Sequence, residues 1–296
     1  MLLFASSAWY HPLALTSAAW TWDPLPLLTL LPALVVYFLG VARLWAAAGR
    51  GHGISAGRAA CFALGVAVAL LALVSPLDRL SDSLFAAHMS QHELLMVVVA
   101  PLIVLGRPFT GYVWALPLPQ RVRVARWVRR PAARGAWRFI SAPLFALVLH
   151  AVTRWVWHLP WLFEAAMKHD RLHAFQHLTF FSTAALLWWA MIHGRYGKAG
   201  YGLSVLFVFA TALHTSILGV LIGVAPRVIY QLYQGRTAVY GWQPLDDQAL
   251  AGIIMWVPSG LLFMICGLAL FAVWLGEAER RANHAAVASE TRGHPS

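Results

Sequence analysis

Residues 84–105 read LFAAHMSQHELLMVVVAPLIVL, and this stretch decides the class of fold. A helix needs about 20 mainly apolar residues to cross the hydrocarbon core of a bilayer. This stretch is that long, and Glu93 is its only acidic side chain, with no lysine or arginine. Its apolar residues form a continuous run instead of alternating, which is typical of a membrane-spanning helix and not of a barrel strand.

Six further windows of this kind predict spans elsewhere in the chain: 27–48, 59–77, 140–157, 172–193, 203–224 and 250–275. The composition agrees, because 60% of the 296 residues are hydrophobic and only 11% are charged, against about a quarter charged in soluble domains. Soluble enzymes and nucleic-acid-binding proteins are thereby excluded, and no nucleic acid is expected as a partner. Cys61 and Cys266 lie in apolar runs without paired spacing, which argues against a disulfide framework or a thiolate metal site.

The distribution of basic residues predicts the orientation of the spans. Of the 22 lysines and arginines, sixteen lie on one side of the seven windows and five on the other, and Arg154 lies within the fourth window. The basic side is cytoplasmic by the positive-inside rule. We therefore predict an all-α integral membrane protein of the cell (inner or plasma) membrane, a bundle of seven transmembrane helices with its N-terminus outside and its C-terminus in the cytoplasm. Its parts are an extracytoplasmic segment (1–26), a single membrane domain (27–276) and a polar cytoplasmic tail (277–296).

The connection at about 106–139 is rich in arginine, with Val, Trp and Ala between the basic residues. This pattern suits an amphipathic helix that lies on the membrane surface. Anchoring to anionic lipid headgroups is the first interpretation, and docking of a partner protein is the second.

Histidine is the unusual residue of the predicted spans. Nine of the 13 histidines lie within or close to a span, and most of them lie toward the predicted outer face. Side chains four residues apart share one helix face and lie about 6 Å from each other. Four stripes have this spacing: His88, His92 and Met96; His150, Arg154 and His158; His169, His173 and His177; Asp247, Ala251 and Met255.

Several ionisable stripes at one depth favour a functional site, because each such side chain is costly to place in a membrane. A lone histidine is more often a packing residue, but a cluster of pairs is not explained by packing. Imidazole with thioether is a ligand set that suits copper, and helix bundles build metal sites from such pairs. The candidate copper ligands are His88, His92, His173, His177, Met96 and Met255. The candidate supporting residues are Asp247, His158, Arg154 and Glu93.

Arg154 has three open interpretations: it neutralises Glu93 or Glu164, it binds an anionic group, or it extends to the outer interface.

Three prolines, Pro101, Pro143 and Pro258, fall within predicted spans and are expected to bend or break them. Such distortions are tolerated where neighbouring side chains cover the freed carbonyl groups.

Three motifs in order carry a resemblance to a known family. They are HMSQHELLMVVVAPLIVLGRP (88–108), WHLPWLFEAAMKHDRLHAFQH (157–177) and DDQALAGIIMWVP (246–258). Together they resemble the CtaG-type cytochrome c oxidase assembly factors of the caa-type oxidase branch, over about residues 20–276. The resemblance implies a multispan protein of the respiratory chain that matures a haem-copper oxidase and handles copper on the outer side. The motif residues that it carries over are His88, His92, Trp157, His158, Pro160, His173, His177, Asp247, Gln248 and Met255.

Three hypotheses follow. The first is a metallochaperone, not an enzyme, that accepts copper from a donor protein and delivers it to an oxidase subunit. Four imidazoles would bind the copper, Met96 or Met255 would favour Cu(I), and Asp247 would orient one imidazole. The second is a membrane electron carrier or quinol oxidoreductase subunit that binds haem non-covalently. The third is a copper or proton transporter whose path is lined by Glu93, Arg154, His150 and His214.

Overall fold

The computed structural model describes residues 20–193 and 200–292, and these residues contain helices and connections but no strand. A helical segment lies at each of the seven predicted windows, so the prediction of an all-helical protein is confirmed. These segments are α1 (Pro24–Ala48), α2 (Ala56–Val74), the series α4 (Phe85–Glu93), η1 (Leu94–Val99) and α5 (Ala100–Leu105), α9 (Pro143–Trp157), α11 (Asp170–His193), α12 (Gly200–Gly223) and α13 (Pro244–Arg292).

Five of the described segments are long and apolar enough to cross a membrane on their own: α1, α2, the series from α4 to α5, α12, and Pro244–Gly276 of α13. A sixth is obtained if α8 (Pro131–Ile140) and α9, which meet at a 55° bend, are counted as one span. Helix α11 is less apolar because it carries His173, Gln176 and His177. The helices are those of a multi-pass membrane protein, whereas the count of seven spans and their orientation stay predictions.

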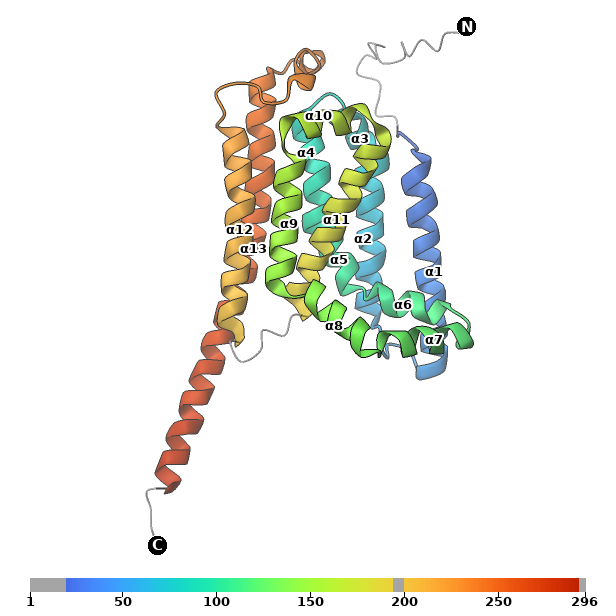
Figure 1. The fold of residues 1–296 in the computed structure, drawn as a ribbon, viewed down its shortest axis with the longest axis vertical. Coiled ribbons are helices and arrows are strands. Elements are labelled where there is room, and N and C mark those ends of the chain that lie inside the picture. Colours follow the sequence, from blue (N-terminus) through green and yellow to red (C-terminus); the bar gives the residue numbers. More distant parts are fainter. Residues whose placement is uncertain (1–19, 194–199, 293–296) are drawn as a thin grey trace.

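The helices form an elongated bundle (Figure 1). Helices α12 and α13 pack side by side along one edge, and α1 lies at the opposite edge. At one end lie the short helices α3 (Pro76–Ser81) and α10 (Pro160–Lys168). Across the other end lie α6 (Pro108–Ala115), α7 (Leu118–Val128) and α8. The arginine-rich connection is therefore a series of short helices at the end opposite to α3 and α10.

The span that carries His88 and His92 is not a continuous α-helix, and the change of helix type occurs shortly before Pro101. Its middle turn, η1, is a π-helix, in which each carbonyl oxygen pairs with the N–H five residues later. For Met96 that partner would be Pro101, which has no N–H. The indole Nε1 of Trp188 on α11 donates to the Met96 carbonyl oxygen instead, at 2.9 Å. The prediction that a neighbour covers a carbonyl freed by proline is confirmed at this position.

The two ends of the chain differ in how far the structure describes them. Residues 1–19 of the predicted extracytoplasmic segment and residues 293–296 of the tail lie outside the described residues. Helix α13 continues to Arg292 and extends beyond the end of the bundle (Figure 1). The predicted tail is therefore helical as far as Arg292. Between α12 and α13 the chain forms two 3-10 turns, η3 (Gln231–Tyr233) and η4 (Thr237–Tyr240).

Candidate metal centre

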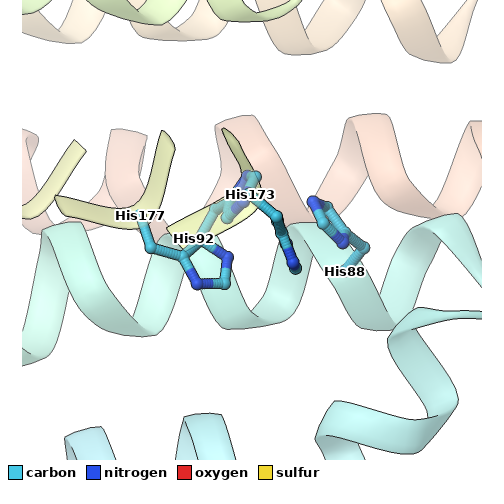
Figure 2. A group of neighbouring side chains, drawn as sticks. All are labelled: His88, His92, His173 and His177. Carbon is cyan, nitrogen blue, oxygen red and sulfur yellow. The ribbon is translucent and has the colours of Figure 1, made fainter. Parts of the chain in front are cut away.

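Four histidines from two helices converge in the bundle. His88 and His92 lie one turn apart on α4, and His173 and His177 lie one turn apart on α11. Figure 2 shows the four imidazoles gathered between these helices. Each residue offers one ring nitrogen, and these four nitrogens all lie within 4.8 Å of one another. The spacing of four residues thus predicts each pair, and the fold brings the two pairs together.

The imidazole rings of this four-histidine cluster (His88, His92, His173 and His177) face each other closely. The centroids of His88 and His173 are 5.2 Å apart with the rings nearly parallel, and those of His92 and His177 are 5.0 Å apart. Aromatic rings close the cluster on two sides. Phe163 of α10 lies 5.2 Å from His88, and Phe180 of α11 lies 4.7 Å from His92, both as centroid distances.

The buried nitrogens of the cluster lack hydrogen-bond partners among the described residues. Both ring nitrogens of His88 and of His92 are buried and unpaired, and so are Nε2 of His173 and Nε2 of His177. A buried polar atom without a partner costs about 1–3 kcal/mol. Six such atoms in one place are therefore expensive for the apo protein, and a ligand that accepts nitrogen lone pairs would remove much of that cost.

The donor set fits one metal ion. Metal–imidazole bonds are about 2 Å long, so nitrogens around one ion lie within about 4 Å of each other. The observed spread of 4.8 Å is less than about 1 Å above that limit. An all-imidazole set suits copper, zinc, iron or nickel, and does not suit the oxygen-preferring ions calcium and magnesium.

The cluster lies near the end of the bundle that carries α3 and α10. His88 and His92 fall in the first two turns of α4, and His173 falls in the first turn of α11. His88 and His92 are buried, whereas His173 and His177 are half-buried. The α11 residues are therefore less buried than those of α4, although Nε2 of each is itself buried.

Asp247 supports the cluster through the backbone of α4. Its Oδ2 accepts a hydrogen bond from the N–H of Phe85 at 2.7 Å, and its Oδ1 accepts one from the N–H of Ala86 at 3.1 Å. Helix α4 begins without a cap of its own, since Leu84 at its N-cap has no polar side chain. Both carboxylate oxygens are thus engaged by the helix start. Asp247 therefore caps α4, because the free N–H groups of a helix start are strong donors, and that it also orients an imidazole stays a prediction.

Replacing Asp247 by alanine is therefore expected to loosen the first turn of α4, which positions His88. We expect a loss of about 1–2 kcal/mol of stability, typical for a lost helix cap, together with weaker metal binding. Thermal unfolding and metal titration of the purified protein measure the two effects. The matched control is Asp246→Ala, since Asp246 is the exposed neighbouring residue. Equal behaviour of the two variants would contradict the capping role.

Arg154 and Glu93 form a buried ion pair beside the cluster. Arg154 Nη2 on α9 pairs with Glu93 Oε1 on α4, the residue next to His92. Only 1% of the Arg154 side chain and 7% of the Glu93 side chain are exposed. Of the interpretations predicted for Arg154, the structure shows neutralisation of Glu93. Glu164 instead accepts a hydrogen bond from the N–H of Gln231 at 2.8 Å.

The structure places the two candidate thioether ligands in other contacts. Met96 Sδ accepts a hydrogen bond from Arg154 Nη1 at 3.7 Å. Met255 packs in an apolar group with Phe85 and Met89, and its carbonyl oxygen lies 3.5 Å from Arg154 Nη2. The π-turn that begins at Leu94 breaks the four-residue register from His92 to Met96. Their role as copper ligands stays a prediction.

Two further histidines of the predicted stripes lie at helix ends. His169 is exposed and precedes α11, so it is not part of the cluster. His158 follows the last residue of α9 and is buried. Its Nδ1 lies 2.6 Å from the carbonyl oxygen of Arg154, and its own carbonyl oxygen accepts a hydrogen bond from the hydroxyl of Tyr230 at 2.9 Å. His158 thus joins α9 to the connection before α13.

Two glutamines hold the site; sequence reasoning missed Gln91 and gave no role to Gln248, although a glutamine in an apolar segment is a usable signal. Gln91 of α4 donates through Nε2 to the Ala72 carbonyl oxygen at 2.8 Å and to Asp78 Oδ1 at 2.9 Å. Burial raises the pKa of Asp78, and the hydrogen bond from Gln91 opposes that shift. Gln248, which the resemblance carried over without a role, accepts from the N–H of Ile229 at 2.7 Å and donates to the Ile222 carbonyl oxygen at 3.1 Å.

The fold and the site define a helical membrane protein with a buried group of four histidines placed to hold a metal ion. The chain belongs to the cytochrome c oxidase caa3 assembly factor (Caa3_CtaG) family, whose sequence profile matches residues 35–277. The resemblance that the three sequence motifs carry is thereby confirmed.

Several curated mycobacterial proteins are similar to this chain. Uncharacterized proteins of Mycobacterium bovis and Mycobacterium tuberculosis are each 25% identical over 256 residues, which cover 84% of this chain and 39% of theirs. An uncharacterized protein of Mycobacterium leprae is 22% identical over 267 residues, which cover 88% of this chain and 40% of its own. This chain therefore spans about 40% of the length of the curated relatives that it matches. No solved structure matches it.

Proposed function

We propose that this chain binds copper at the four-histidine cluster and delivers it to a subunit of cytochrome c oxidase while that enzyme is assembled. The observation that carries the proposal is the convergence of four imidazoles whose buried nitrogens have no partner among the described residues. Membership of a cytochrome c oxidase assembly family supports copper over the other metals that imidazoles bind. The role is assembly of an enzyme and not catalytic turnover.

The surroundings of the cluster favour cuprous over cupric copper. The four ligands are neutral, and the nearest rings, Phe163 and Phe180, are apolar. The cost of burying an ion rises with the square of its charge, so a singly charged ion costs roughly a quarter as much as a doubly charged one. The nearby carboxylate of Glu93 is already paired with Arg154 and leaves no net negative charge to balance a second positive charge.

The same geometry disfavours the haem alternative. A porphyrin bound between two facing imidazoles needs a wide flat space around the iron. The remaining two imidazoles and the rings of Phe163 and Phe180 occupy that space, since all four ligand nitrogens lie within 4.8 Å. The crowding of the cluster therefore supports an ion over a macrocycle.

Delivery requires that partner proteins reach the ligands. His173 and His177 are the less buried of the four residues and lie one to two turns from the start of α11. A donor protein and an oxidase subunit would both exchange copper from that end of the bundle. The arginine-rich helices α7 and α8 lie at the other end and would bind anionic lipid headgroups there.

The test is the copper content of the purified, reduced protein and of its variants. His88→Ala/His92→Ala is expected to lose about one copper per chain, because two of the four imidazole ligands disappear. In cells the same variant is expected to lower the amount of assembled oxidase, measured by its haem absorption and oxygen consumption.

The matched control is His169→Ala, which removes the exposed histidine that lies outside the cluster on the same sequence stripe. This variant is expected to keep its copper and the oxidase. Unchanged copper content in His88→Ala/His92→Ala would overturn the proposal, and stoichiometric iron with an intense Soret band would favour the haem alternative.

A further inference from the structure

A second pair of histidines lies deeper in the bundle. His150 of α9 and His214 of α12 have ring centroids 5.7 Å apart, at an interplanar angle of 68°. His150 is buried, and both ring nitrogens of His214 are buried without a hydrogen-bond partner among the described residues. Neither residue belongs to the four-histidine cluster or to the motifs that carry the family resemblance. Two neighbouring imidazoles in an apolar bundle, one of them with both ring nitrogens buried and unpaired, point to a ligand.

Thr183 determines which nitrogen of His150 can bind a ligand. The Thr183 hydroxyl donates its only proton to the carbonyl oxygen of Thr179 at 2.9 Å, with Phe180 as a longer second acceptor. Because the contact with the Thr179 carbonyl oxygen is the shorter one, Thr183 Oγ1 is placed to accept from His150 Nδ1, which lies 3.3 Å away. This arrangement favours the tautomer of His150 with its proton on Nδ1, which leaves the lone pair on Nε2. Hydrogen bonding of the non-ligating nitrogen is how metal-binding histidines are usually held.

We propose that His150 Nε2 and one ring nitrogen of His214 form an inner site for a cuprous ion. This inference rests on the proposed function, because it takes Cu(I) as the cargo. Cuprous copper is a d¹⁰ ion that binds stably to two neutral nitrogen ligands, whereas zinc prefers four. The oxidation state does not change in this proposal, since the ion only exchanges ligands.

Helix α9 connects the two sites. Residues four apart rise about 6 Å along a helix, so His158, Arg154 and His150 mark successive depths. His158 donates through Nδ1 to the carbonyl oxygen of Arg154 at 2.6 Å, which leaves its buried Nε2 with an unpaired lone pair. Lone-pair nitrogens therefore occur at the outer cluster, at His158 and at the inner site. The ion pair of Arg154 with Glu93 lies between them and leaves no net charge to repel a cation.

The experiment counts cuprous ions bound to the purified full-length chain in detergent, under reducing conditions, by competition with a chromophoric Cu(I) chelator. The unmodified protein is expected to bind two ions per chain. His88→Ala/His92→Ala and His150→Ala/His214→Ala are each expected to bind one. Thermal unfolding reports whether each variant is folded. His150→Gln, which keeps a polar side chain, replaces the alanine variant if that variant unfolds.

A milder variant tests the geometry with both imidazoles in place. Thr183→Val removes the acceptor for His150 Nδ1 and is expected to weaken the inner site by roughly 10–100-fold. The matched control is Thr179→Val on the same helix, because the Thr179 hydroxyl contacts Trp157 and not His150. This control is expected to leave the affinity of the inner site unchanged.

The copper counts distinguish a failure of the inner site from a failure of the proposed function. If the unmodified protein binds one ion, and only the variant of His88 and His92 loses it, the inner site is refuted and the proposed function stands. If only the variant of His150 and His214 loses an ion, the outer cluster is not the copper site and the proposed function fails. Equal counts in the unmodified protein and in His150→Ala/His214→Ala also refute the inner site, and the pair is then a proton-binding or packing pair.

Discussion

Replacing Arg154 by methionine is expected to lower the stability of the protein by about 3–5 kcal/mol, which is the usual cost of removing one partner of a buried ion pair. The guanidinium of Arg154 is the only described cationic group paired with the Glu93 carboxylate, and 93% of the Glu93 side chain is buried. Methionine keeps much of the volume and the apolar stem but leaves Glu93 without a counter-charge. Glu93 would then have to bind a proton or separate α4 from α9.

The loss extends beyond one contact, because Arg154 joins three segments. Its Nη1 donates to Met96 Sδ in η1, and its Nη2 lies 3.5 Å from the Met255 carbonyl oxygen of α13. The Arg154 carbonyl oxygen also accepts the hydrogen bond from His158. We therefore expect weaker copper binding in the same variant, since Glu93 neighbours His92.

A double-mutant cycle measures the pair directly. Thermal unfolding in detergent compares Arg154→Met, Glu93→Gln and the two changes together. The combined variant is expected to be more stable than the sum of the single losses predicts, because no unpaired charge stays buried. Additive losses would contradict this account.

The matched control is Lys168→Met at the exposed pair of Lys168 with Glu164. Its Nζ–Oε2 distance is 3.8 Å, and 59% of the Lys168 side chain is exposed. Exposed pairs contribute about 0–1 kcal/mol. A loss in Lys168→Met as large as that in Arg154→Met would show that the burial of the pair is irrelevant.

Replacing Gly252 by alanine is expected to separate α12 from α13 and to cost about 1–3 kcal/mol, the usual range for overpacking a close contact. A Cβ atom at Gly252 would lie 2.5 Å from the Cα of Gly223 and 2.6 Å from the carbonyl oxygen of Gly219. Both neighbours are backbone atoms, so no side chain can move aside. Gly219 and Gly223 form a small-residue pair four apart, which lets two membrane helices approach closely.

This change is also expected to weaken copper binding, because α13 carries Asp247 five residues earlier. Displacing α13 would draw the Asp247 carboxylate away from the N–H groups of Phe85 and Ala86. Thermal unfolding and copper titration test both effects. Valine at position 252 is expected to have a larger effect than alanine, since it adds volume at the same contact.

Gly260 provides the control for this prediction on the same pair of helices. A Cβ atom there would meet only the Oγ of Ser216, at 3.6 Å, which is an ordinary contact distance. Gly260→Ala is therefore expected to be neutral or to stabilise α13 by up to about 1 kcal/mol through helix propensity. If both glycine variants lose the same stability, close packing of the two helices is not the cause.

The sequence alone predicted the helices and part of the site, for reasons of period and polarity. Continuous apolar windows predict helices because only helices satisfy the backbone inside a bilayer. A spacing of four predicted the pairs His88 with His92 and His173 with His177, because such residues share one helix face. Pro101 predicted a distortion of the third window, and a π-helical turn, η1, precedes it, whereas α13 continues through Pro258. The count of spans was less determined, since the polar residues of α11 lower its hydropathy.

The sequence could not determine which helix faces pack against each other. The meeting of α4 with α11, which brings four nitrogens within 4.8 Å, is a tertiary fact, because many packings of a helix bundle satisfy the same apolar windows. The partner of Arg154 was left open among three interpretations, and only the approach of α9 to α4 selects Glu93. Asp247 lies far from Phe85 in the chain, so its capping of α4 could not be predicted from the sequence. The sequence therefore determined which residues are costly to bury, because the polarity of a side chain is a property of that residue alone. The tertiary structure decided which of these residues share a site, because contacts between helices depend on how the whole chain packs.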